Sequence, residues 1–370
     1  MQHHDTVVVG AGVAGASVAW HLGGALVLEQ GPDVAGEATS QNAGMIRRLS
    51  EDPIERALAF RSWDFFEEED WGASTRTGAV LALAHDPWHL HDAVAVLRLR
   101  GARVERGSDL EVLQGARLAE VWSLPDERVA SGPRLAEGFL RTSTVRCGVQ
   151  VQRLVVESGR VVGLETSEGS LRADRVVLAA GAWSGRLAAT AGLQRRLVPV
   201  RRAVMRTTPH RLAQGPWIWL DDLGAYLRPE DGAFLVSGCD EAVDTAPTGP
   251  GSTGVLPDAA WTLTQDKLAC LPALGPLEKA EGWTGLRTFA PDHRPLLGGD
   301  GEVDGLWWAA GLGGFGVTCA PGVGQVVAAW MKGETVDDIL PRQVAPNRLL
   351  SDRIALRPDG RADGARLQLV

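Results

Sequence analysis

The sequence predicts an α/β fold with two lobes. Apolar runs typical of strands alternate with helical segments from one end of the chain to the other, which is the pattern of an α/β protein. The chain has 370 residues, of which 45% are hydrophobic, so it is longer than most single domains and can bury a large core. Two lobes are therefore expected, and each element is considered in turn below.

The chain begins with the pattern of a strand, a helix and a second strand. Residues Thr6–Val9 form an apolar run, Val13–Leu22 has the composition of a helix that is closed by Gly23 and Gly24, and Ala25–Leu28 is apolar again. This order predicts two parallel strands joined by a helix.

A glycine pattern, Gly10-x-Gly12-x-x-Gly15, lies in the turn of this unit. Gly10 permits a tight turn, Gly12 lets the backbone approach a pyrophosphate, and Gly15 lets the helix pack closely on the sheet. Glu29 ends the second strand, where an acid accepts hydrogen bonds from an adenosine ribose. An ordinary glycine turn is the alternative, but the strand, the helix and the acid together favour dinucleotide binding. They leave FAD and NAD open.

Two further segments favour a flavin. Gly36–Met45 is small and polar, as a backbone that runs closely along an extended cofactor needs to be. Gly311–Thr318 follows an expected strand at Leu306–Ala310 and precedes an expected helix from about Pro321 to Met331. A second glycine-rich turn at a helix N-terminus suits the polar edge of a flavin ring, where negative charge develops on reduction.

The remaining pattern predicts one long core helix, at Ile54–Trp71, and two groups of strands. The first group forms a small antiparallel layer that leads back into the main sheet, and the second forms an antiparallel sheet that suits the floor of a substrate pocket. The first group comprises Val149–Val156, Val161–Glu165 and Val176–Ala180, and the second Leu197–Thr207, Trp217–Leu220, Ala225–Arg228 and Ala233–Ser237.

Charge and composition exclude some functions. The formal net charge of -9 argues against a nucleic-acid partner. No apolar stretch reaches the roughly 18 residues of a membrane span, and no signal peptide is recognised, so a cytoplasmic location is expected. The four cysteines are scattered and predict free buried thiols without a metal site, and His3 and His4 are expected in a solvated tail. Residues Pro346–Val370 are expected to form a weakly docked or disordered tail.

Together with Ala180–Trp183 and Gly285–Pro295, these segments resemble the D-amino-acid oxidase (DAO) superfamily of FAD-dependent oxidoreductases, from Asp5 to about Met331. The likeness is greatest to D-amino-acid dehydrogenases of the D-arginine type, with glycine and sarcosine oxidases as relatives. It implies a Rossmann-like FAD-binding domain, as in glutathione reductase, joined to an antiparallel-sheet substrate domain. The expected FAD-binding domain is discontinuous (1–78, 141–198 and 283–345), and the substrate domain takes 79–140 and 199–282.

The resemblance also implies the site residues. Arg202, Tyr226 and Arg287 match positions that clamp an amino-acid carboxylate, for which a guanidinium fork and a phenol are suited. The residues expected to bind FAD are Gly10, Gly12, Val13, Ala14, Gly15, Glu29, Gln30, Thr39, Ser40, Gln41, Asn42, Ala43, Gly44, Met45, Val151, Ala180, Gly181, Trp183, Gly313, Gly314, Phe315, Gly316, Val317 and Thr318. Cys319 is not the position at which relatives attach flavin, so non-covalent FAD is expected.

The expected reaction is oxidative deamination of a small amino acid or N-substituted amino acid, by hydride transfer from the amine carbon to flavin N5. The D-arginine type selects a basic side chain with an acid and a histidine, and this chain has Thr77-Gly78-Ala79 and Met45-Ile46 there, so a neutral or apolar substrate is expected. Trp217 and Trp219 are candidates for an apolar pocket wall. Oxygen, or a quinone or another carrier, takes the electrons. A glycine- or sarcosine-oxidase-like secondary amine oxidase is the alternative, and a monooxygenase or a non-catalytic nucleotide-binding protein is a distant one.

Overall fold

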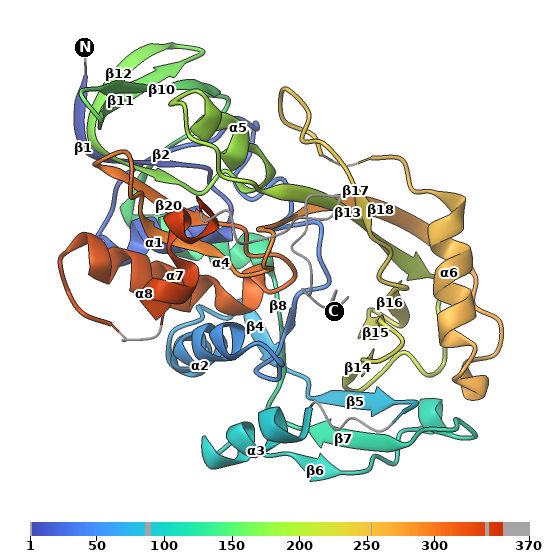
Figure 1. Ribbon diagram of the computed structural model, residues 1–370. Coiled ribbons are helices and arrows are strands. Elements are labelled where there is room, and N and C mark those ends of the chain that lie inside the picture. Colours follow the sequence, from blue (N-terminus) through green and yellow to red (C-terminus); the bar gives the residue numbers. More distant parts are fainter. Residues whose placement is uncertain (1, 86–89, 253, 337–339, 351–370) are drawn as a thin grey trace.

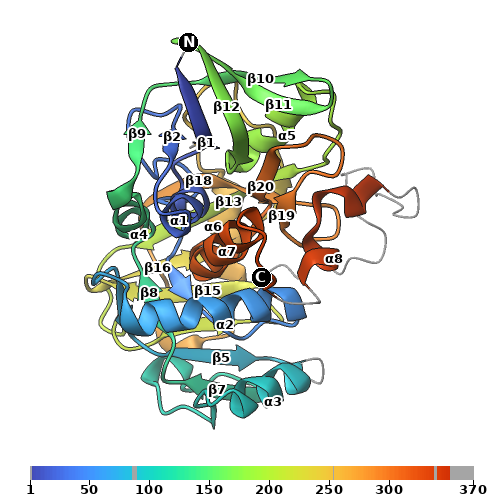
Figure 2. The same cartoon turned by 90° about the vertical axis from the view of Figure 1, so that its left-hand side faces the viewer.

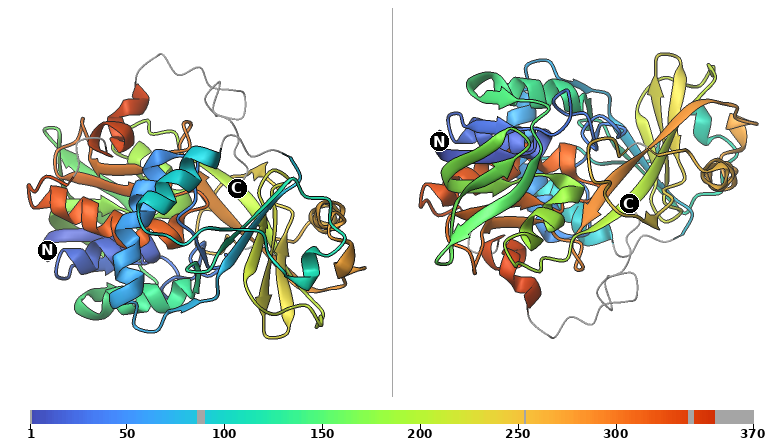
Figure 3. Two further views of the ribbon diagram at one scale, coloured as in Figure 1. Left: turned by 90° about the horizontal axis from the view of Figure 1, so that it is seen from below. Right: turned by 90° about the horizontal axis from the view of Figure 1, so that it is seen from above.

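The computed structural model describes residues 2–85, 90–252, 254–336 and 340–350. Two large β-sheets occupy opposite halves of the molecule, and helices pack against a face of each sheet (Figure 1, Figure 3). This mixed α/β architecture confirms the predicted fold class.

The first sheet has a parallel core that carries the N-terminal unit. Its strands run in the spatial order β20 (Leu306–Ala310), β12 (Gly169–Leu178), β1 (His3–Val9), β2 (Leu26–Leu28) and β9 (Thr144–Arg146), and all four pairings are parallel. The turn that follows β1 therefore opens at the carboxyl edge of the sheet, where α/β proteins bind their ligands.

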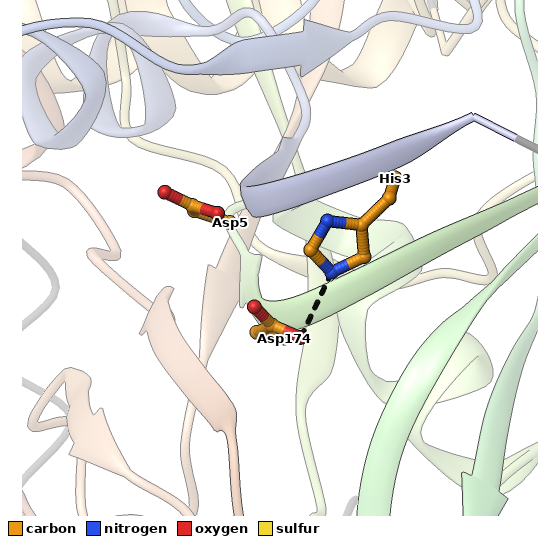
Figure 4. Close-up of side chains that lie close together, drawn as sticks. All are labelled: His3, Asp5 and Asp174. Carbon is orange, nitrogen blue, oxygen red and sulfur yellow. Dashed lines mark hydrogen bonds and ion pairs between the residues drawn. The ribbon is translucent and has the colours of Figure 1, made fainter.

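The strand β1 starts earlier than expected, so His3 and His4 belong to it and not to a solvated tail. His3 pairs with Arg172 and His4 with Ala173, because β12 extends far enough to add these rungs to the ladder. His3 Nε2 lies 3.0 Å from Asp174 Oδ1, and Asp5 lies beside them on the exposed edge (Figure 4). Exposed groups of this kind commonly lie together without an ion, so we assign no metal here.

An antiparallel layer extends the first sheet. It consists of β10 (Val151–Glu157), β11 (Arg160–Thr166) and the first half of β12, while β19 (Leu296–Gly299) pairs antiparallel with β20. β12 begins seven residues before the expected strand because Gly169–Arg172 pairs with β11 as a hairpin. The layer leads into the parallel core, as the sequence predicted.

Four helices cover one face of the first sheet (Figure 2). They are α1 (Val13–His21), α2 (Pro53–Glu68), α4 (Gly132–Phe139) and α7 (Gly316–Met331). α7 begins before the expected Pro321, which lies inside the helix and leaves the carbonyl group of Val317 without its usual N–H partner. α2 ends before Trp71, whose φ of 53° leaves the helical region and whose ring packs edge-on against Trp20 and Phe139.

The second sheet is largely antiparallel and lies in the other half of the molecule. Its strand order is β17 (Ala242–Val243), β13 (Val198–Thr207), β16 (Ala233–Ser237), β15 (Ala225–Glu230), β14 (Trp217–Leu220), β5 (Ala79–Leu83), β7 (Glu120–Leu124) and β6 (Glu105–Arg106), and β18 (Lys279–Phe289) pairs with β13. The helix α6 (Asp258–Leu268) packs on its outer face and α3 (His91–Leu99) lies near β5 (Figure 1). A third, small sheet joins β3 (Met45–Ile46), β8 (Arg128–Ala130) and β4 (Ser74–Arg76).

The predicted division into an FAD-binding and a substrate domain remains a proposal. The two sheets follow its main outline, with the first sheet built from strands in the predicted FAD-binding segments. The helix α4 was included in the substrate segment 79–140, but Leu135, Ala136 and Phe139 pack into the core around α1. We therefore propose that this helix belongs with the first sheet.

The described part of the chain after α7 has little regular secondary structure. It contains α8 (Leu340–Val344) and a 3-10 turn at Pro346–Leu350. The short helix α5 (Ser184–Ala189) lies earlier in the chain, after β12. Most of the expected tail, residues 351–370, lies outside the described residues. Within the part of the chain that is described, no helix combines the length and the hydropathy of a membrane span.

Candidate active site

One elongated cavity of about 490 Å³ runs from the turn after β1 to the face of the second sheet. Gly10 and Gly12 line one end, and Tyr226 and Arg287 line the other. An extended ligand in this cavity would therefore touch both lobes, which is the arrangement that a dinucleotide cofactor and a substrate require.

At the nucleotide end, the glycines hold a turn that larger residues would block. Gly10 has a φ of 106°, and a Cβ there would lie 2.5 Å from the carbonyl oxygen of Ala179. Gly15 does not line the cavity. A Cβ at this position would lie 2.1 Å from the Gly10 carbonyl oxygen, so Gly15 lets α1 approach the turn closely. Gly12 caps α1 without a side chain, so the positive end of the helix faces the cavity and fits a pyrophosphate.

Glu29 lies at the end of β2, as the sequence predicted, and is buried. Its carboxylate accepts hydrogen bonds from the backbone N–H groups of Ala11 at 2.9 Å and Gly31 at 2.8 Å. Burial raises the pKa of Glu29, and these two hydrogen bonds oppose the rise. The carboxylate is thus fixed beside the glycine turn, where an adenosine ribose would lie.

The segment from Thr39 to Met45 runs along the cavity and joins the lobes. Thr39 Oγ1 accepts a hydrogen bond from the N–H of Val13 at 3.0 Å, so the segment is tied to the start of α1. Gln41 packs against β18, where a Cβ on Gly285 would lie 2.7 Å from the Gln41 Oε1. Ser40 is exposed, bonds to the Glu37 carbonyl oxygen and does not line the cavity.

The second glycine-rich turn closes the other side of the cavity. A Cβ on Gly313, whose φ is 52°, would lie 2.5 Å from the Phe289 ring, so the backbone approaches β18 closely. Thr318 at the start of α7 bonds to the carbonyl oxygen of Met45 at 3.3 Å and ties both cofactor segments together. Phe315 does not line this cavity and faces a second one. The other residues expected to bind FAD line the cavity, with the exception of Gly15 and Ser40.

Arg202, Tyr226 and Arg287 converge at the far end of the cavity. Arg202 on β13 lies opposite Gly285, and Arg287 on β18 lies opposite Val200, so the two arginines share one face of the sheet. Arg201 points the other way, toward Asp244 at 3.4 Å. Trp219 stacks on the Tyr226 ring with centroids 5.6 Å apart, which holds the phenol in place.

The charges at this end suit an anion. Burial, together with the nearby Arg202 guanidinium, lowers the pKa of Arg287 to about 10, so the group remains protonated at neutral pH. Burial raises the pKa of Tyr226, which keeps its hydroxyl proton available for a hydrogen bond. Three donors therefore face one space without a carboxylate among the residues that line this end.

Two residues that the sequence analysis missed belong to this end. Glu241 accepts a hydrogen bond from Arg202 at 2.8 Å and lies 3.8 Å from Arg287, so it fixes both guanidinium groups from behind. Arg47 lines the cavity between Met45 and Trp219. Its position two residues after the cofactor segment was the available signal, whereas nothing near Glu241 in the sequence distinguishes it from a surface acid.

Two other residues have structural roles. The side chain of Asp300 is fully buried and pairs with Arg195 away from the cavity. Cys319 is buried in α7 and does not line the cavity, which supports non-covalent FAD. Trp217 lines only the second cavity, while Trp219 lines both.

The fold and the cavity together are typical of a dinucleotide-dependent oxidoreductase with two lobes. The family described as FAD dependent oxidoreductase, DAO, matches residues 5–330, and the chain belongs to it. The protein is thus an FAD-dependent enzyme, as the sequence predicted.

The chain resembles proteins that are named for different amino-acid substrates. A glycine oxidase of Bacillus licheniformis is 25% identical over 90% of this chain and 95% of its own length. A D-amino acid dehydrogenase of Cereibacter sphaeroides is 33% identical over 58% of this chain and 49% of its own length. The solved structure of an L-proline dehydrogenase from P. horikoshii matches with a TM-score of 0.83 at 21% identity, over 94% of this chain and 98% of that one, which supports the fold.

Proposed function

We propose that the protein oxidises a small amino acid or N-substituted amino acid whose side chain is neutral. The observation that carries the proposal is the single cavity that joins the nucleotide turn to Arg202, Tyr226 and Arg287. Relatives named for glycine and for D-amino acids support an amino-acid substrate.

In this proposal the chain's own residues bind and orient the substrate. Arg202 and Arg287 bind the carboxylate through their guanidinium groups and Tyr226 donates a third hydrogen bond, so the C–H bond at the amine carbon faces the glycine turn at Gly313. Bound FAD supplies the acceptor for the hydride that this carbon loses. The amine loses a proton, and water hydrolyses the resulting imine to a keto acid and ammonia or an amine.

The walls favour a neutral side chain. Met45, Val204, Trp219 and Leu286 line the substrate end, and the carboxylates that line the cavity, Glu29 and Glu37, lie at the nucleotide end. A cationic side chain would therefore enter a space bordered by arginines, where like charges repel.

Anaerobic reduction of the flavin tests the substrate class. We expect the flavin absorption of the purified protein to bleach with at least one member of a panel of glycine, sarcosine, D-amino acids, L-proline and other N-substituted amino acids. Bleaching by sarcosine and other secondary amines alone would favour the secondary amine oxidase. Absence of bleaching with the whole panel would contradict the proposal.

A clamp variant tests the binding mode. Replacing Arg287→Met removes a charge-assisted hydrogen bond worth about 1.5–3 kcal/mol, so kcat/KM falls roughly 10- to 100-fold. Arg206→Met on β13 is the matched control, because Arg206 is half-buried outside the cavity and should leave kcat/KM unchanged. Equal kcat/KM in both variants would exclude Arg287 from the carboxylate site.

A further inference from the structure

A second cavity, of about 560 Å³, adjoins the first and has no role in the reaction described above. The two cavities share Arg47, Trp219 and Gly314 in their walls. Arg47 therefore lies at the boundary between the substrate end of the active site and this second space.

The second cavity is acidic. More carboxylates than basic side chains line it. The basic side chains are Arg47, Lys267 and His293, and the carboxylates are those of Glu51, Asp52, Glu55, Glu127, Asp221, Asp222 and Asp292. Three of these acids pair with arginines outside the cavity: Asp52 with Arg294, Glu127 with Arg48 and Asp292 with Arg348. A fourth, Asp222, forms a hydrogen bond with His85. The remaining negative charge makes the space attractive to a cation.

The Arg47 guanidinium lies at the boundary between the two cavities, among two aromatic rings and two acids. Its guanidinium carbon lies 4.4 Å from the centroid of the Trp219 ring and 4.2 Å from that of Phe315. Burial lowers the pKa of Arg47, while the charges of Glu55 and Asp221 act in the opposite direction and favour its positive form. Two aromatic faces and two acids are the elements with which proteins bind organic cations.

The neighbouring arginine shows the contrast. Arg48 stacks on Trp63 at 3.6 Å and forms a direct ion pair with Glu127 at 3.1 Å, so it is locked into the core. Within the described part of the chain, Arg47 is held by ring faces and by the field of nearby acids and makes no direct ion pair. An external cation of the same shape could take its place.

We propose that Arg47 determines substrate specificity by occupying, with its own guanidinium, a site that would otherwise accept the ammonium or guanidinium group of a basic amino acid. This inference rests on the function proposed above. With Arg47 in place, a side chain that extends past Trp219 meets a positive charge and a closed wall. Without it, the two cavities join, and the acidic space receives a cationic end.

The experiment compares wild-type holoenzyme with Arg47→Ala, using racemic norleucine and racemic lysine as probes. These differ by the terminal ammonium group, so the ratio of their kcat/KM values reports on charge. We expect wild type to prefer norleucine at least 100-fold and Arg47→Ala to reduce this preference at least tenfold. Arg100→Ala is the matched control, because Arg100 stacks over Phe60 at 5.5 Å at the exposed end of α3 and should change nothing.

A binding measurement separates this inference from the proposed function. Methylguanidine should raise the Tm of Arg47→Ala and leave wild type and Arg100→Ala unaffected, whether or not any amino acid reduces the flavin. If Arg47→Ala does not fold, Arg47→Gln replaces it in both assays.

Three results would overturn the inference. One is wild-type turnover of lysine equal to that of norleucine. Another is an Arg47 variant whose preference is unchanged and which does not bind methylguanidine. The third is a selective loss of activity toward glutamate in the variant, which would assign Arg47 to recognition of a second carboxylate.

Discussion

Replacing Asp300 by asparagine tests whether this residue stabilises the fold or binds the cofactor. The first role predicts a lower Tm with the flavin retained, and the second predicts loss of flavin at an unchanged Tm. Its carboxylate receives Arg195 Nη2 at 3.0 Å, the indole N–H of Trp308 at 2.9 Å and the backbone N–H of Glu302 at 2.9 Å. The Arg195 and Asp300 side chains are both fully buried. Asp300→Asn therefore leaves a buried guanidinium with less of its compensating charge.

The magnitude follows from this burial. Removing one partner of a buried ion pair costs about 3–5 kcal/mol. Glu302 still contacts Arg195 at 2.7 Å and is half-exposed, so the lower value of about 3 kcal/mol applies. For a chain of 370 residues we expect Tm to fall by about 4 °C.

Thermal unfolding followed by circular dichroism in excess FAD measures this change. Asp304→Asn is the matched control: Asp304 lies in the same turn, and its ion pair with Arg160 is exposed on both sides, so its loss should cost less than about 1 kcal/mol. We expect Asp300→Asn to keep its flavin and its kcat/KM well below Tm. Loss of flavin at an unchanged Tm would refute the reasoning and place Asp300 in the cofactor site.

The remaining predictions concern the cavity. Glu29→Gln weakens the proposed hydrogen bonds to ribose and should raise the Kd for FAD roughly tenfold, measured by fluorescence titration of the apoprotein, with the exposed Glu165→Gln as control. Gly10→Ala should lose FAD and lower Tm. The control Gly159→Ala, at a φ of 78° with open space around it, should lower the unfolding free energy only by the backbone strain of about 1 kcal/mol. Equal effects of the two variants would contradict the proposed clash at Gly10. Burial raises the pKa of Glu55 from 4.5 to about 7, so the folded protein holds a proton that the unfolded chain has lost, and the unfolding free energy of wild type falls between these pH values. Glu55→Gln should show a shallower slope in urea unfolding series at pH 4.5–8, because Glu127, whose pKa burial also raises to about 7, still contributes to it. Parallel curves throughout would disprove the raised pKa of Glu55.

The nucleotide site could be predicted from sequence because its geometry is local. Gly10, Gly12 and Gly15 act within one turn, and Glu29 follows the adjacent strand, so spacing along the chain fixes their placement. The boundaries of four strands of the second sheet, β13 to β16, were predicted to within two residues for the same reason, since alternation and turn residues lie within each hairpin.

The substrate end depended on strand register and on contacts between distant segments. Arg202 and Arg287 share a face because β13 pairs with β18 in one particular register, and Glu241 joins them only once the chain has folded back. The same applies to Phe315, which lines the second cavity instead of the first and lies against Arg47.

The sequence by itself thus determined the α/β class, the nucleotide turn and the expectation of FAD, because these follow from patterns over a few neighbouring residues. The tertiary structure decided which arginines face the first cavity, that α4 packs beside α1, and that Arg47 lies between this cavity and an acidic one. Such arrangements arise from packing between elements far apart in the chain, and no local pattern encodes them.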